Sequence, residues 1–97
     1  MGELQMNLED EKRVQIFRAL ADETRIQIIR VLKQKGSELS CGEIGDFINI
    51  PKSTVSYHFR ILREAGLTTT RKESLNRFVS LRSDTFQKYI PGFLESL

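Results

Sequence analysis

The sequence predicts a mainly α-helical single domain, residues 1–97, with one small β-hairpin near its end. Three observations support this fold class. Apolar residues recur at helical spacing in four successive segments of the first 66 residues. β-branched and apolar residues then flank a short polar turn within residues 68–81, as in a hairpin. Helical spacing returns over residues 83–97, and a chain of 97 residues supports one core rather than two.

The first two helices are indicated by residues that favour helix ends. Asn7 can cap a helix over about residues 8–20, whose acidic first turn suits the helix dipole. Asp22 can cap a second helix, which ends at Gly36. The residues expected to be buried are Val14, Phe17 and Leu20 in the first helix and Ile28, Ile29 and Leu32 in the second.

A third, short helix follows residues 38–39, which can add a third strand to the hairpin. Ser40 and Glu43 have the spacing of a capping box, in which each side chain accepts a hydrogen bond from the other residue's backbone. Ile44 and Phe47 are expected to be buried.

The fourth helix, residues 51–65, is the most informative segment. Pro51 suits the first turn of a helix, and Gly66 suits the position just past one. Its side chains divide into two faces at about 3.6 residues per turn. The apolar face comprises Val55, His58, Phe59, Leu62 and Ala65, and the opposite face comprises Ser53, Ser56, Tyr57, Arg60 and Glu64.

Residues 48–50 join the third and fourth helices so tightly that the pair forms a helix-turn-helix unit. Glu, Lys and Gln usually dominate a helix face that meets only water. Short hydroxyls, one aromatic ring and an arginine instead suit a surface that approaches its partner closely and donates hydrogen bonds to it. The major groove of double-stranded DNA is such a partner, so residues 51–65 are predicted to be a recognition helix.

The hairpin, residues 68–81 with a turn at residues 74–76, is predicted to form a wing beside this helix. It lies in a positive part of the chain. Residues 51–82 carry a net charge of +5, whereas the segments before and after them carry −2 and −1. A positive block in an otherwise acidic chain is typical of a protein that binds a polyanion.

The last helical segment begins at Ser83 or Asp84 and is expected to break at Pro91-Gly92. The second, third and fourth helices are expected to supply most of the core. The terminal helices, about residues 8–20 and 83–97, are therefore expected to bury their stripes in a homodimer interface. A two-fold dimer would place its recognition helices about 34–36 Å apart, one turn of a palindromic operator. The last stripe comprises Phe86, Tyr89, Ile90, Phe93, Leu94 and Leu97.

Two segments carry a resemblance to a known family. Residues 17–25 (FRALADETR), and residues 53–59 (STVSYHF) followed by 62–67 (LREAGL), resemble the arsenic-repressor (ArsR) family of winged helix-turn-helix regulators. The resemblance spans roughly residues 14–82. It implies a dimeric bacterial or archaeal transcription factor, usually a repressor that leaves its operator when an effector binds. It also implies that the wing touches flanking backbone or minor groove, and that the terminal helices form the dimer.

The chain departs from the metal-sensing members of that family. Those members carry Glu-Leu-Cys-Val-Cys-Asp/Glu-Leu, whereas residues 38–44 read Glu-Leu-Ser-Cys-Gly-Glu-Ile. Ser40 and Gly42 replace both ligand cysteines, and residues 83–97 hold no histidine for the other familiar metal site. One cysteine and one histidine cannot complete a four-ligand zinc site within one subunit. We therefore expect no sensory metal of the usual family type, and no cofactor.

Ten residues of the recognition helix and wing are predicted to contact DNA. Ser53, Ser56 and Tyr57 are expected to meet base edges directly or through water, and Arg60 to meet a phosphate. The alternatives are polar residues that face only solvent, a solvated hairpin tip, and an Arg60–Glu64 ion pair. The ten are Lys52, Ser53, Thr54, Ser56, Tyr57, Arg60, Arg71, Lys72, Asn76 and Arg77.

The single histidine and the single cysteine have plainer interpretations. His58 lies on the inner stripe, where a packed, hydrogen-bonded ring is expected rather than a ligand or a catalyst. Cys41 lies in the first turn of a helix, where the helix dipole favours oxidation or modification of a thiol. A redox role for Cys41 would need a cysteine from a partner subunit or a small thiol, and its alternative is a simple packed residue.

Other classes of protein are disfavoured. The chain holds no Ser/His/Asp set, paired-carboxylate motif or phosphate-binding glycine loop, so it is not expected to be an enzyme. The absence of a signal peptide and of an apolar run near the ~20 residues that span a membrane leads us to expect a cytoplasmic protein. The alternative function is a winged-helix protein-interaction module without specific DNA binding. The operator, the regulated genes, any effector, and the choice between repression and activation stay open.

Overall fold

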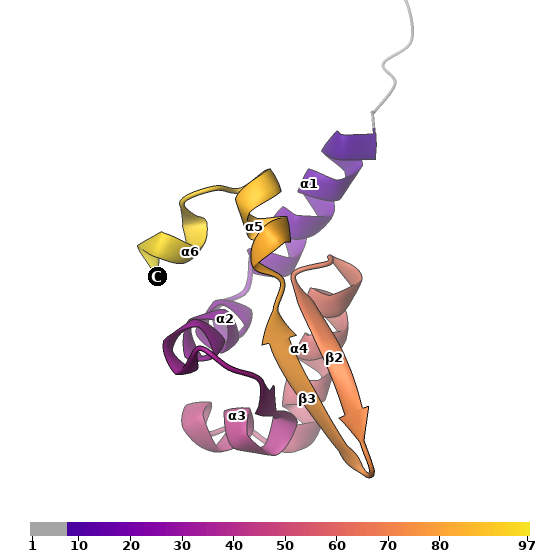
Figure 1. The fold of residues 1–97 in the computed structure, drawn as a ribbon, viewed down its shortest axis with the longest axis vertical. Helices are drawn as coiled ribbons and strands as arrows, with labels where there is room; N and C mark the ends of the chain where they lie inside the picture. Colours follow the sequence, from indigo (N-terminus) through magenta and orange to yellow (C-terminus); the bar gives the residue numbers. More distant parts are fainter. Residues whose placement is uncertain (1–7) are drawn as a thin grey trace, which may run out of the picture.

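The computed structural model describes residues 8–97, which form six helices and three strands (Figure 1). This arrangement confirms the predicted mainly helical fold with one hairpin, and residues 91–92 separate the last two helices as predicted. None of the helices combines the length and apolar character that crossing a membrane requires. The cap expected at Asn7 lies outside the described residues. The elements are α1 (Leu8–Leu20), α2 (Glu23–Lys35), β1 (Leu39–Ser40), α3 (Cys41–Ile48), α4 (Lys52–Glu64), β2 (Thr68–Glu73), β3 (Asn76–Leu81), α5 (Ser83–Tyr89) and α6 (Phe93–Ser96).

The predicted ends of α2 and α3 are confirmed. The side chain of Asp22 caps α2 by accepting a hydrogen bond from the backbone N–H of Arg25 at 3.1 Å. Gly36 ends α2 in the left-handed conformation, with φ of 67°. Ser40 and Glu43 form the capping box of α3 through reciprocal hydrogen bonds of 2.9 and 3.1 Å. These caps satisfy backbone donors that a helix start would otherwise leave unpaired.

A tight turn joins α3 to α4. Asn49 adopts the left-handed conformation, with φ of 59°, and the N–H of Ile50 donates to the carbonyl of Gly45 at 3.0 Å. Pro51 occupies the N-cap position with extended backbone, so α4 begins one residue later than predicted. Gly66 follows α4 with φ of 78°, a conformation that glycine adopts without strain.

The strands form an antiparallel sheet in the order β1–β3–β2, whose long hairpin lies beside α4 (Figure 1). Ser74 and Leu75 alone make the hairpin turn, because Asn76, expected in the turn, pairs with Glu73. The predicted third strand is present, but it comprises Leu39 and Ser40 rather than residues 38–39.

The core includes the inner sides of the terminal helices. Ile16 and Ala19 of α1 are fully buried, and Phe86 of α5 is 1% exposed. The expectation that these helices bury their stripes against a second copy is therefore wrong for Leu20 and Phe86, which are buried within their own chain. The reason is that α1 and α5 lie close together within one chain, where Lys88 is 3.6 Å from Glu9. Ile16 and Ala19 lie outside the stripe that was predicted for the first helix.

Three other residues expected to be buried are exposed. Val14 and Phe17 are 37% and 56% exposed. The buried side of α1 consists instead of Ile16, Ala19 and Leu20, and Val14 and Phe17 lie outside it. Phe47 is 52% exposed on α3, and the ammonium of Lys35 lies 4.3 Å from the centre of its ring. Helical spacing alone did not identify which side of α1 or α3 meets the core.

The turn between α3 and α4 generates a stability prediction at Gly45. A Cβ at this position would lie 2.7 Å from the carbonyl oxygen of Ile50, which is backbone and cannot move away cheaply. Gly45→Ala is therefore expected to lower the free energy of unfolding by roughly 1–3 kcal/mol through overpacking, as measured by denaturant titration.

Gly42→Ala in the same helix is the matched control for this variant. A Cβ there meets only the Ser40 hydroxyl, at 3.9 Å. The control is expected to be neutral or to stabilise by up to about 1 kcal/mol, because alanine loses less backbone freedom than glycine when a helix forms. Equal effects of the two variants would contradict this account of the turn.

Candidate nucleic-acid interface

α4 exposes the face that the sequence assigns to a partner. Its inner residues Val55, Phe59 and Leu62 are at most 3% exposed and fix the helix against the core. His58 is 8% exposed, which confirms its predicted place on the inner side. The outward side chains include Lys52, Ser53, Thr54, Tyr57 and Arg60, all exposed, and Ser56, which is half-buried.

A groove runs between α4 and strand β3. We call this cavity of about 280 Å³ the recognition groove. It brings four predicted contact residues of the helix together with one from the wing, and it adds Arg63, which the sequence interpretation did not include. Arg63 lies seven residues after Ser56 and three after Arg60, so helical spacing alone could have identified it. The groove is lined by Ser53, Ser56, Tyr57, Arg60, Arg63 and Arg77.

The three arginines of the recognition groove keep their positive charge available. Across residues 8–97, no carboxylate forms an ion pair with Arg60, Arg63 or Arg77. The alternative Arg60–Glu64 pair is therefore not formed, and the Arg60 guanidinium instead lies 5.8 Å from the centre of the Tyr57 ring. Three unpaired guanidinium groups in one groove attract an anion, and their planar forks suit phosphate oxygens.

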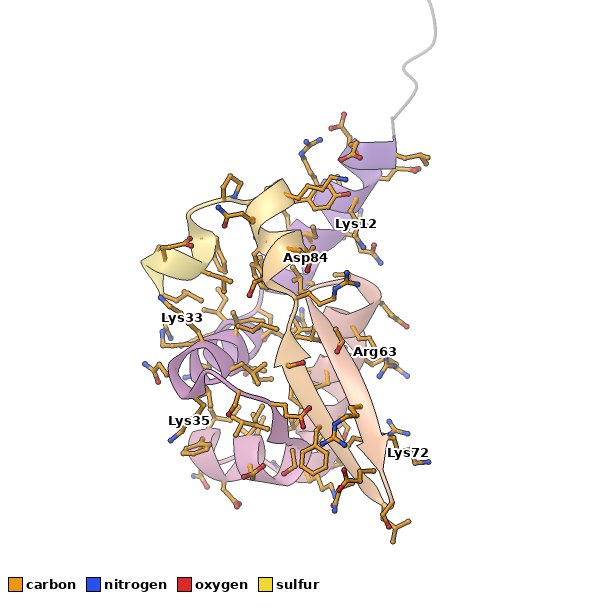
Figure 2. All side chains as sticks on the ribbon, in the orientation of Figure 1. Lys12, Lys33, Lys35, Arg63, Lys72 and Asp84 are labelled. Carbon is orange, nitrogen blue, oxygen red and sulfur yellow. The ribbon has the colours of Figure 1, made fainter. Side chains whose placement is uncertain are left out.

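A second hollow, of about 230 Å³, continues from this groove toward the tip of the wing. Ser56 and Arg77 line both hollows. Lys52 at the start of α4 and Asn76 in the wing line the second one only. Lys72 pairs with Arg77 in the β2–β3 register. Figure 2 shows Lys72 and Arg63 extending outward at the same edge of the molecule, near β2. The wing and α4 therefore present their basic groups on the same side of the molecule.

Arg71 differs from the other predicted contacts. Its guanidinium donates to Glu38 at 2.5 Å and to Glu73 at 2.6 Å, and it lies 4.8 Å from the centre of the Phe78 ring. These hydrogen bonds raise the pKa of Arg71 above its ordinary value, and the hydrogen bond from Arg71 lowers the pKa of Glu38. Arg71 therefore links the wing to the loop before β1, and two carboxylates neutralise its charge.

The remaining candidate chemistry is sparse. Cys41 is 4% exposed and packs in the core as the first residue of α3. Within residues 8–97, no three side chains of His, Cys, Asp or Glu lie close enough to share a metal ion. The redox role of Cys41 and the absence of a sensory metal stay predictions.

Comparisons with known proteins match this architecture. Residues 20–71 match the family model described as a helix-turn-helix domain. The chain is 63% identical over 89 residues to an uncharacterised HTH-type transcriptional regulator, YceK of Bacillus subtilis, which covers 92% of this chain and 89% of that protein. It is 37% identical over 83 residues to the transcriptional activator HlyU of Vibrio cholerae, with coverage of 86% and 75%.

Solved structures agree with these relatives. The structure of HlyU from Vibrio cholerae superposes with a TM-score of 0.76 at 33% identity, covering 94% of this chain and 92% of that one. A domain of Mb0332 from Mycobacterium bovis has a TM-score of 0.72 at 22% identity, with coverage of 81% and 72%. Mb0332 is described as a homodimeric winged helix-turn-helix DNA-binding domain and a possible ArsR-family regulator. At that identity, the likeness to Mb0332 shows the fold alone.

The state of the arginines predicts their reactivity toward phenylglyoxal. Arg63 and Arg77 are exposed and have no carboxylate partner among residues 8–97, so they are expected to react several-fold faster than Arg71. The two carboxylate partners of Arg71 stabilise its protonated form. Arg25 is also expected to react slowly, because its side chain is only 12% exposed. Peptide mass spectrometry after brief labelling measures each rate. Labelling of the denatured chain is the control, in which the rates should converge, and fast labelling of native Arg71 would contradict its pairing.

Proposed function

Because this chain belongs to the helix-turn-helix transcriptional regulators, and is of the ArsR type, we propose that it binds a palindromic DNA operator as a homodimer. The observation that carries the proposal is the recognition groove. It joins the outer face of α4 to the wing and contains three arginines without carboxylate partners among the described residues. We also propose that it acts in the cytoplasm, beside the chromosome it regulates.

α4 is proposed to lie in the major groove. Ser53, Ser56 and Tyr57 would face base edges, since hydroxyl groups can both donate to and accept from them. The small side chains of Ser53 and Ser56 also let the helix approach closely. Lys52 and Thr54 flank this set at the start of the helix, where a recognition helix makes its base contacts.

The wing and the arginines are proposed to hold the DNA backbone. Arg60, Arg63 and Arg77 would contact phosphates along the recognition groove, and Lys72 and Asn76 would extend these contacts toward the flanking DNA. For Arg71, the geometry favours a supporting role, because its ion pair with Glu38 fixes the wing against the body of the domain.

The dimer is proposed to use the outer side of α1 together with the C-terminal helices. Val14 and Phe17 are exposed three residues apart on one face of α1, and burial against a second copy would remove these apolar side chains from water. The domain of Mb0332, which shares the fold, is described as homodimeric. A two-fold axis at α1 would present two copies of α4 to successive turns of DNA.

Repression is the proposed mode of regulation, as the family resemblance implies. HlyU, described as an activator, makes activation the alternative. A reporter driven by the promoter beside the operator distinguishes them. Deleting the gene for this chain raises expression under repression and lowers it under activation.

The phosphate contacts predict a charge-dependent affinity. Arg63→Ala and Arg77→Ala should each weaken binding to every duplex, because each removes a phosphate contact. A plot of log affinity against log salt concentration has a negative slope, and each variant should make that slope shallower by about one. Fluorescence anisotropy with selected and scrambled duplexes measures both effects.

Lys35→Ala is the control for these two variants, since it also removes one positive charge. Figure 2 places Lys35 on the opposite side of the molecule from Arg63. The salt dependence of DNA affinity for Lys35→Ala should therefore stay near that of the natural chain. A protein-interaction module would instead show no duplex binding even at low salt, which would overturn the proposed function.

The base contacts predict a change in preference rather than a uniform loss. Ser56→Ala and Tyr57→Ala should reduce discrimination between operator and scrambled duplex, at roughly 1–3 kcal/mol for each lost base contact. Selection of bound sequences from a random pool supplies the operator for this measurement. If Tyr57→Ala binds both duplexes as the natural chain does, α4 is not the reading face.

A further inference from the structure

Arg25 joins three parts of the domain. Its Nε donates to the carbonyl of Ala19, near the end of α1, at 2.6 Å. Its Nη1 lies 3.1 Å from Nδ1 of His58, on the inner side of α4. Arg25 itself belongs to α2, and its backbone N–H is held by the cap residue Asp22. One half-buried guanidinium therefore bridges α1, α2 and the recognition helix.

His58 is the α4 side of this bridge. Because a guanidinium has donors only, Nδ1 of His58 must accept, so the ring is neutral with its proton on Nε2. Its neighbour Tyr57, in the recognition groove, packs edge-on against the imidazole with ring centres 5.2 Å apart. The only histidine of the chain thus lies between a fixed cation and an exposed residue of the reading face.

We propose that Arg25 and His58 are positioning residues for DNA recognition, and that this joint between α1 and α4 opens when the His58 ring takes up a proton. The proposal rests on the proposed function for its effect on DNA. α1 is the proposed dimer helix and α4 the proposed reading helix, so the joint sets one relative to the other.

The electrostatics of the joint favour the neutral ring. Burial lowers the pKa of His58 below its ordinary value, Arg25 lowers it further, and Asp22 opposes both. Arg25 and Asp22 are the charged groups that act on the ring within the described residues, and Tyr57 is its titratable neighbour on α4. A depressed pKa in the folded state means that the unfolded chain binds the proton more readily. The contribution of His58 to the free energy of unfolding is therefore fully present above about pH 6.5, and it is lost as the pH falls below that value.

A pH titration of DNA binding tests the joint. At constant ionic strength, the affinity of the natural chain for its selected operator should fall several-fold, and by less than about tenfold, from about pH 7.5 to about pH 5.5, as the joint opens. His58→Asn is the conservative variant, because an amide oxygen can accept from Arg25, does not titrate, and has a helix propensity similar to that of histidine. His58→Asn should bind the operator as tightly at the lower pH as the natural chain does at the higher pH.

Two further variants each remove one partner of the Arg25–His58 contact. Arg25→Met and His58→Leu should bind weakly at both pH values, as the natural chain does at the lower one. Arg30→Met, on the same helix and without an ion pair among residues 8–97, is the matched control and should follow the natural pH profile. Circular dichroism melts confirm that each variant is folded before its affinity is compared.

Nuclear magnetic resonance of the single imidazole provides an independent measurement. If the bound state needs the closed joint, DNA binding must lower the His58 pKa by linkage. An unchanged pKa on DNA binding, or a His58→Asn profile identical to the natural one, would overturn the proposal.

Failure of the proposed function has a different signature. In that case no variant binds any duplex at either pH. Amide exchange of the free protein still tests the joint, because acid should expose α4 in the natural chain but not in His58→Asn. Exposure of α4 that is equal in the two proteins would overturn the joint on its own.

Discussion

The burial of one side of α4 is the constraint on which the rest of the structure depends. Val55, Phe59 and Leu62 place that side against α2, α3 and the sheet with almost no exposure. Because a helix cannot rotate without withdrawing this stripe from the core, its opposite face must point outward. The tight turn at Gly45 and Ile50 fixes where α4 begins, so both its rotation and its starting point are determined.

The wing uses its two faces for different electrostatic purposes. On β3, Arg77 shares a face with Val79, which is fully buried, and it reaches the recognition groove beside α4. Arg71, paired across the hairpin with Phe78, lies on the other face with Glu38 and Glu73. Carboxylates therefore gather where a cation supports the wing and are absent from the part of the recognition groove that the structure describes. A phosphate approaching the groove meets positive charge without competition.

The sequence allowed the faces of α4, the capping box and the wing to be predicted, because each depends on local periodicity or on residues a few positions apart. Arg63 was also within reach, since its spacing from Arg60 is helical. The pairing of Arg71 with Glu38 was not predictable, because Glu38 lies 33 residues away and meets it only through the pairing of β1 with β3. The burial of α1 depended likewise on tertiary packing. Ile16 and Phe17 are adjacent in sequence, yet one is fully buried and the other exposed.

That division of α1 has a mechanical consequence. Its inner side belongs to the core of its own chain, while Val14 and Phe17 remain outside. A dimer formed through those residues would transmit its geometry through a helix that is already packed against α2 and α4. Arg25 strengthens this connection at the point where α1 ends, since it bonds both to Ala19 and to the inner side of α4. The spacing of two reading helices in such a dimer would therefore be a property of the chain's own core, and changes within that core could alter operator choice without touching a DNA contact.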